Sequence, residues 1–219
     1  MIHLYGLVQE LEELPSLFGI DGAPLERWRT DDFDLVVSRS TGQVSEISEE
    51  AVLAHANVVE ELMGLSRAVL PARFGRAFTS DEELWDAVRA KASGLERGLT
   101  RVRDCVEFGL RALAPERVQA DLEGSSGREY MRARLAEATE RARLADELHE
   151  PLAALSRASV RFPGAAGDLL HAAYLVREAN AGAFRERVGA LETVHASLVL
   201  VCTGPWPPYT FAGEGEHAA

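Results

Sequence analysis

Apolar positions along the first half of the chain alternate between continuous runs and helical spacing. Ile2–Val8 and residues 34–39 are short apolar runs, which are typical of buried strands. Residues 49–66 change to a spacing of three and four, which predicts an amphipathic helix with Ser48 as its N-cap. The apolar stripe expected on this helix consists of Val52, Ala56, Val59 and Met63.

A second strand–helix–strand series follows. Residues 68–78 return to extended geometry, interrupted by Pro71 and Gly75. Ser80 and Glu83 then form a capping box that begins a long helix, and residues 105–113 alternate as in a half-buried strand. The helix stripe comprises Leu84, Val88, Ala92, Leu95, Leu99 and Val102.

A polar stretch with glycine and serine, residues 115–125, separates this half from the next. Ser126 and Glu129 form another capping box, and an apolar stripe from Met131 to Leu155 predicts a long helix that Pro151 must kink or end. The remaining expected elements are strands at Val160–Phe162, Leu169–Val176 and Ser197–Cys202 and a helix at Ala183–Val194.

This order predicts an α+β protein of two domains, each a mixed or antiparallel sheet with helices. We expect an N-terminal domain over residues 1–115, a C-terminal domain over 125–211 led by the long helix, and a disordered tail at 212–219. Helix, two strands, helix and strand are most of a split β-α-β unit, so the second domain resembles a modified ferredoxin-like fold.

Charge and composition narrow the classes of partner. The formal net charge is −12, which argues against nucleic acid. No apolar run is long enough to span a bilayer, and no secretory signal is visible, so we expect a cytoplasmic protein. Cys105 and Cys202 are far apart, each in an apolar run, which is typical of small buried side chains rather than of a disulfide.

Catalytic and metal-binding motifs are not evident. The six histidines lack metal-ligand spacing, and no nucleophile elbow or glycine-rich phosphate loop occurs. Arg73 and Arg76 could bind an anion, but solvated or ion-paired arginines beside a bent strand are the commoner arrangement. We therefore expect no catalytic residues, no metal site and no cofactor.

Three of the nine prolines lie in a short segment near the C-terminus, Gly204-Pro205-Trp206-Pro207-Pro208-Tyr209-Thr210-Phe211. Proline fixes φ and lacks an amide hydrogen, so this segment cannot be a helix or a central strand. It is either a clamp that packs on its own domain or a docking surface for another protein. We expect the clamp, with Trp206 and Tyr209 packed mainly within the chain, so that Trp206→Ala lowers stability before partner binding.

Several motifs resemble those of the gas vesicle protein GvpF/GvpL family. Leu70-Pro71-Ala72-Arg73-Phe74-Gly75 is similar to its Leu-Pro-x-Arg-Phe-Gly signature, although valine is more usual than Ala72. The resemblance extends in order from Ile2 to Phe211. Further matching features are Tyr5-Gly6, His55, Val106-Glu107-Phe108-Gly109-Leu110, Gly127-Arg128-Glu129-Tyr130-Met131, Ala173-Tyr174-Leu175-Val176 and the closing segment through Phe211.

The resemblance implies a non-enzymatic accessory protein of gas vesicle formation. Such a protein would bind the shell protein GvpA, and other accessory proteins, and assist early assembly, with some members at the gas-facing side. The motif residues expected to have structural or partner-binding roles are Pro71, Arg73, Phe74, Gly75, Glu107, Gly204, Pro205, Trp206, Pro207, Pro208, Tyr209 and Phe211. The alternative is a small-molecule-binding or enzymatic ferredoxin-like protein, with a pocket around Arg73, His55 and Glu107.

Overall fold

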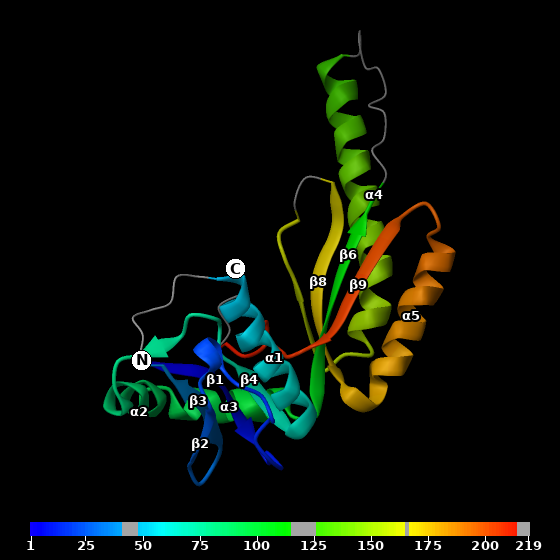
Figure 1. The fold of residues 1–219 in the computed structure, drawn as a ribbon. Coiled ribbons are helices and arrows are strands. Elements are labelled where there is room, and N and C mark those ends of the chain that lie inside the picture. The colour runs from blue at the N-terminus through cyan, green and yellow to red at the C-terminus, as the bar shows by residue number, and fades with distance from the viewer. Residues whose placement is uncertain (41–47, 115–125, 165–166, 214–219) are drawn as a thin grey trace. The chain divides into compact units, whose positions relative to one another are not determined.

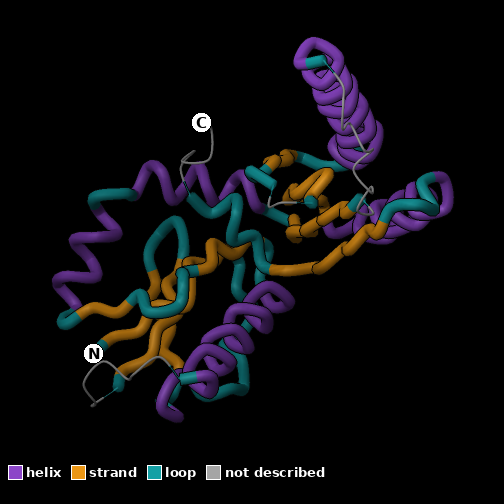
Figure 2. The backbone as a smooth tube through the Cα atoms, turned by 90° about the horizontal axis from the view of Figure 1, so that it is seen from above, coloured by secondary structure: helices purple, strands orange, loops and turns teal. Residues whose placement is uncertain are grey.

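The computed structural model describes residues 1–40, 48–114, 126–164 and 167–213. The chain folds as two compact units, the first formed by Met1–Glu107 with the segment from Trp206 onward and the second by Phe108–Pro205. Both units combine helices with strands, which confirms the mixed α+β class (Figure 1 and Figure 2). The expected linker at 115–125 and the tail after residue 213 lie outside the described residues.

The first unit is built on an antiparallel sheet in the order β2-β3-β1-β4, with β5 also paired to β1. Seven of the eight residues of β1 are buried, as the continuous apolar run predicted for a strand covered on both faces. β2, which mixes charged and apolar residues, was not expected from the sequence. The strands are β1 (Ile2–Gln9), β2 (Leu25–Arg29), β3 (Asp34–Arg39), β4 (Ala68–Pro71) and β5 (Ala77–Phe78).

The helices of this unit differ from expectation in phase and length. α1 (Glu49–Leu65) begins at the expected Ser48 cap, but it buries Ala51, His55, Val58, Val59 and Leu62, and Val52 is 38% exposed. The spacing predicted the helix, whereas packing against the sheet determined which side of the helix is buried. The single helix expected after Ser80 is two, α2 (Asp81–Arg89) and α3 (Ala92–Val102).

The second unit contains a four-stranded sheet in the order β7-β8-β6-β9. β6 (Cys105–Leu113) lies between β8 (Asp168–Arg177) and β9 (Val199–Trp206). We had expected β6 in the first domain, so this placement is a correction. Its neighbours in the sheet come from the far end of the chain, and no local pattern could identify them.

With β6 included, the elements follow the β-α-β-β-α-β order of ferredoxin-like units. The others are α4 (Gly127–Ala153), β7 (Ala158–Arg161), a short 3-10 turn at Glu178–Asn180 and α5 (Ala181–Val194). The chain passes from the first unit to the second near the start of β6 and returns near the end of β9. Both connections between the units therefore lie within strands.

Aromatic side chains form the core of the second unit. Phe184 of α5 stacks on Phe108 of β6 with ring centroids 4.9 Å apart and contacts Tyr174 of β8 at 5.3 Å. His149 of α4 hydrogen-bonds through Nδ1 to the Tyr174 hydroxyl at 2.9 Å. Both helices are therefore anchored to the face of the sheet that carries Phe108 and Tyr174.

Only the second half of α4 contributes to this core. Its buried residues are Ala145, Leu148 and Leu152, whereas every residue from Gly127 to Thr139 is exposed. In Figure 1 this first half extends beyond the strands of the unit. The expected stripe is therefore present but packed over half its length, and Pro151 is accommodated without ending the helix.

Both cysteines are free, Cys105 buried and Cys202 partly so, as the sequence indicated. None of the helices in the described ranges is long and apolar enough to cross a membrane.

Candidate functional site

The signature segment, Leu70 to Gly75, begins in β4 and pairs with the interior strand β1. Pro71 pairs with Gly6, and the Ala72 amide donates to the Tyr5 carbonyl at 2.8 Å. A Cβ at Gly6 would lie 2.8 Å from the Leu70 carbonyl oxygen, so a larger residue cannot occupy this position without displacing the backbone. The Tyr5-Gly6 and Leu-Pro motifs are thus two sides of one packed strand pair.

His55 stabilises the turn that follows the β1–β4 strand pair. Its side chain is buried, and Nε2 donates to the Ala72 carbonyl oxygen at 2.9 Å. The imidazole stacks on Tyr5 at 5.2 Å between centroids and meets the edge of Phe74 at 5.8 Å. Burial, with a smaller contribution from His3, lowers the pKa of His55, so its neutral form is favoured.

The side chains of Arg73, in the signature segment, and Arg76, directly after it, share no bonding partner among the described residues. Arg73 and Arg76 are both exposed, and the Arg76 guanidinium lies 5.4 Å from the centre of the Phe78 ring. Gly75 between them has φ +82°, a left-handed turn conformation that favours glycine. The hydrogen bonds and ion pairs of the described residues connect none of Arg73, His55 and Glu107 to one another.

Glu107 connects the C-terminal segment to the rest of the first unit by hydrogen bonds. Its carboxylate accepts from the Thr210 amide at 2.8 Å and from the Thr210 hydroxyl at 2.7 Å. Burial raises the pKa of Glu107 and outweighs the opposing effect of these two bonds. Two motifs that are 103 residues apart in the sequence are therefore joined through one carboxylate.

The proline-rich segment begins as a continuation of β9 rather than after its end. β9 includes Gly204, Pro205 and Trp206, and it is an edge strand, where proline is tolerated. Arg185 of α5 donates to the Gly204 carbonyl at 3.2 Å. The expectation that this segment could not be a central strand agrees with this edge position.

Burial within the segment falls on residues other than those we expected. Pro207, Pro208 and Phe211 are buried, Phe211 with 4% of its surface exposed. Trp206 is 47% exposed and Tyr209 37%. The prolines and Phe211 are thus the packed residues of the clamp, and the two larger amphipathic rings remain accessible to solvent.

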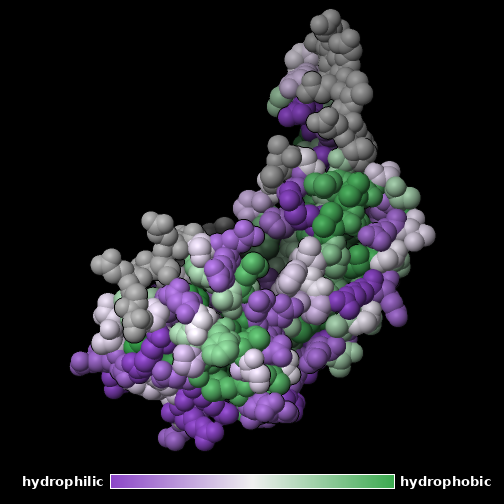
Figure 3. Space-filling model, viewed as in Figure 1, coloured by the Kyte–Doolittle hydropathy of each residue, from purple (hydrophilic) through white to green (hydrophobic). Residues whose placement is uncertain are grey.

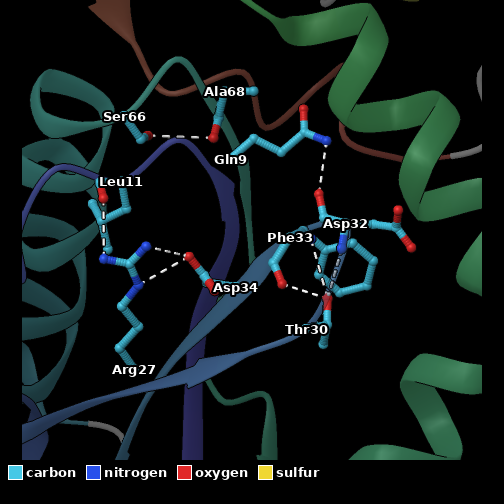
Figure 4. Close-up of polar contacts among 9 residues, drawn as sticks. All are labelled: Gln9, Leu11, Arg27, Thr30, Asp32, Phe33, Asp34, Ser66 and Ala68. Atoms are coloured by element: carbon cyan, nitrogen blue, oxygen red, sulfur yellow. Dashed lines mark hydrogen bonds and ion pairs between the residues drawn. The ribbon is translucent and has the colours of Figure 1, made fainter.

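A shallow hollow of about 230 Å³ lies beside the turn between β2 and β3, whose polar contacts are drawn in Figure 4. The polar groups around it bond one another: Gln9 Nε2 donates to the Asp32 carbonyl at 3.0 Å, and Arg27 pairs with Asp34 at 2.6 Å. The Thr30 hydroxyl donates to the Phe33 carbonyl at 2.5 Å. These bonds stabilise the turn, and no group of metal-binding side chains occurs within the described ranges.

The sequence did not indicate this hollow, because it forms only when residues 8–10 pack against 30–34. Its lining also includes Arg103, which forms an ion pair with Glu10.

Exposed apolar side chains on the second unit are the more distinctive feature. Met131 and Leu135 of α4 are 66% and 69% exposed, and Val194 at the end of α5 is 74% exposed. Val199 and Val201 of β9 are also exposed, and Figure 3 shows hydrophobic surface over the beginning of this strand. Exposed apolar patches mark interaction sites, of which protein–protein contacts are one kind.

Comparison with known proteins gives a consistent assignment. Residues 1–213 match the family model of the gas vesicle synthesis protein GvpL/GvpF. Gas vesicle protein F2 of Halobacterium salinarum is 28% identical, over 96% of this chain and 91% of its own length. Gas vesicle protein L of a Streptomyces species is also 28% identical, over 85% of this chain and 77% of its own.

Two solved structures share the fold over nearly their whole length. The crystal structure of GvpF from Anabaena sp. has a TM-score of 0.79 at 19% identity, covering 100% of this chain and 98% of that one. GvpF from Microcystis aeruginosa also gives 0.79, at 21% identity, covering 97% of this chain and 98% of that one. On the match of its sequence over residues 1–213, this chain belongs to the GvpL/GvpF family of gas vesicle proteins.

Proposed function

We propose that this protein binds the gas vesicle shell protein GvpA and assists the early assembly of the vesicle. The single observation that carries the proposal is the exposed apolar surface of the second unit, on α4 and at the edge strand β9. In a gas vesicle protein, the natural partner for such surface is another vesicle protein with apolar surface of its own.

The physical role follows from the nature of a vesicle wall. A shell subunit that excludes water exposes apolar area before it is incorporated, and exposed apolar area promotes aggregation. A partner with a net charge of −12 can cover part of that area and keep the complex dispersed by charge repulsion. The role requires no catalytic step, and other gas vesicle accessory proteins could bind the same complex.

The motif residues divide into two groups under this proposal. Pro71, Phe74, Glu107 and Phe211 maintain the fold around His55 and Thr210, whereas Trp206 and Tyr209 offer exposed aromatic surface. We place the protein in the cytoplasm, in association with the gas vesicle.

Co-expression with GvpA and affinity capture of this chain tests the proposal. We expect GvpA to be recovered with the captured chain and to remain dispersed in its presence, and gas vesicles to be lost when the gene is deleted. Failure to recover GvpA in buffers of low and high salt, with the captured chain folded, contradicts the proposal. Trp206→Ala separates the two roles of the C-terminal segment, because unchanged melting with lost GvpA recovery assigns Trp206 to docking.

A further inference from the structure

The first half of α4 presents an apolar stripe that the described part of its unit leaves uncovered. We define the α4 stripe as Met131, Leu135, Ala138 and Ala142, all exposed. Their spacing of four, three and four is that of the seam in a pair of packed helices. The stripe lies where α4 extends past the strands in Figure 1.

This half of the helix has its own stabilising interactions. The Ser126 hydroxyl and the Glu129 carboxylate form a complete capping box at its start. Arg134 lies 3.8 Å from Glu137 within this half, and alanine, arginine and glutamate are strong helix formers. Immediately after this half, Arg143 pairs with Glu140 and Glu147. Arg141 Nη2 donates to the Asp168 carbonyl at 2.9 Å and fixes the helix to the start of β8. The stripe is therefore held on an ordered helix.

Positive charge flanks the α4 stripe on both sides. Successive helix residues are turned by about 100°, so Arg128, Arg132 and Arg134 lie within about 90° of the middle of the stripe. The glutamates of this half lie more than about 120° away. Within the described residues, Arg128 and Arg132 form no ion pair, whereas Arg134 lies 3.8 Å from Glu137. The glutamates concerned are Glu129, Glu137 and Glu140.

The arginines beside the α4 stripe indicate which kind of partner could bind it. A second copy of this chain would bring the same arginines alongside the stripe, and like charges facing one another across a helix pair are unfavourable. A helix whose apolar stripe is flanked by Asp and Glu would instead pair its carboxylates with Arg128, Arg132 and Arg134. This local excess of positive charge stands out in a chain whose net charge is −12.

We propose that the α4 stripe docks an amphipathic helix of a partner protein, with the apolar seam of that helix flanked by acidic residues. The inference deepens the proposed function, on which it rests for the identity of the partner, by specifying the surface used and the chemistry it recognises.

Two synthetic helical peptides of about 21 residues, three heptads long, probe the stripe directly. Both carry leucine at the seam positions, and they differ only in having glutamate or lysine on the flanks. Fluorescence anisotropy with the full-length chain, at about 50 mM salt to limit screening, should show the glutamate peptide binding at least tenfold more tightly. Equal binding of the two peptides, or no binding of either, overturns the inference.

Variants of the full chain locate the binding. Leu135→Glu should weaken binding of the glutamate peptide at least tenfold, whereas Val194→Glu, at a residue of similar exposure on α5, should leave it unchanged. The double variant Arg132→Glu and Arg134→Glu should reverse the preference towards the lysine peptide. All four positions are exposed, so circular dichroism should report an unchanged fold. Binding that Leu135→Glu does not weaken overturns the inference.

Sedimentation and GvpA capture distinguish the remaining outcomes. A dimer of the wild-type chain that Leu135→Glu abolishes would assign the stripe to a second copy and overturn the inference. If the Leu135→Glu variant recovers GvpA as well as the wild type does, the stripe is not the docking surface, although the proposed function stands. If the wild type discriminates between the peptides but recovers no GvpA, the proposed function fails. The α4 stripe then binds an acidic helix of a protein other than GvpA.

Discussion

Glu107 shows how a single residue connects distant motifs in this protein. Its carboxylate bonds both donors of Thr210 and so closes the C-terminal segment against the first unit. His55 acts in a similar way inside that unit, where it bonds the Ala72 carbonyl between Tyr5 and Phe74. Both are polar side chains whose bonds lie within the fold, so their first effect is on stability.

Removing the Glu107 carboxylate should destabilise the first unit. Glu107→Ala leaves the Thr210 amide and hydroxyl without their acceptor, and we expect the free energy of unfolding to fall by about 1–3 kcal/mol. Thr210→Val, which keeps the amide donor, should cost less. The exposed Glu96→Ala on α3 is the control and should change stability by less than about 0.5 kcal/mol. Urea denaturation followed by circular dichroism measures all three, and equal effects of Glu107→Ala and Glu96→Ala would contradict the assignment.

The buried His55 should make stability depend on pH. Its pKa in the folded state lies below the ordinary value of 6.5, so between these two values the unfolded chain binds more protons. The free energy of unfolding should therefore fall as the pH decreases below about 6.5. His55→Gln should flatten this slope in urea melts from pH 8 to pH 5, and His195→Gln is the control for removing a histidine elsewhere. Burial also lowers the pKa of His3 and of His149, so these two histidines leave a residual slope.

At the scale of elements, α4 combines two different environments in one helix. Its second half is packed by Leu148 and Leu152, whereas its first half, from Gly127 to Thr139, has no buried residue. Helices without tertiary packing rely on caps and side-chain pairs, so the Ser126 cap matters most there.

Loss of the Ser126 cap should loosen α4 without lowering the stability of the whole protein. Ser126→Ala removes a cap worth about 1 kcal/mol, and because the first turns of α4 pack on nothing described, the effect should remain local. Hydrogen exchange should accelerate in residues 127–135 while the melting temperature stays the same. Ser80→Ala removes the equivalent cap from α2, whose Leu84 and Val88 are buried, and should lower the melting temperature instead. A global loss in Ser126→Ala would show that the first half of α4 is coupled to the core.

At the scale of the whole molecule, the two units do not follow one another along the chain. The first unit includes the residues from Trp206 onward, and the second begins within β6. A division at 115–125, which composition suggested, separates β6 from the strands with which it pairs.

Fragments test this organisation. A fragment of residues 105–206 contains all six elements of the β-α-β-β-α-β unit and should unfold cooperatively in urea. A fragment of residues 125–211 lacks β6, whose Phe108 and Leu110 are buried, and should show no cooperative transition. Circular dichroism and denaturation curves of both fragments measure the difference, and a cooperative transition in the shorter fragment would contradict this division.

Local pattern by itself determined most of the elements and the family. Runs such as Ile2–Val8, the Ser48 and Ser126 caps and the ordered motifs are properties of neighbouring residues, and they predicted strands, helix starts and the resemblance correctly. Tertiary structure alone decided which face of α1 is buried, where β6 belongs and which rings of the C-terminal segment are exposed. Each of these depends on contacts between residues far apart in the chain, such as Glu107 and Thr210, and periodicity contains no information about such partners.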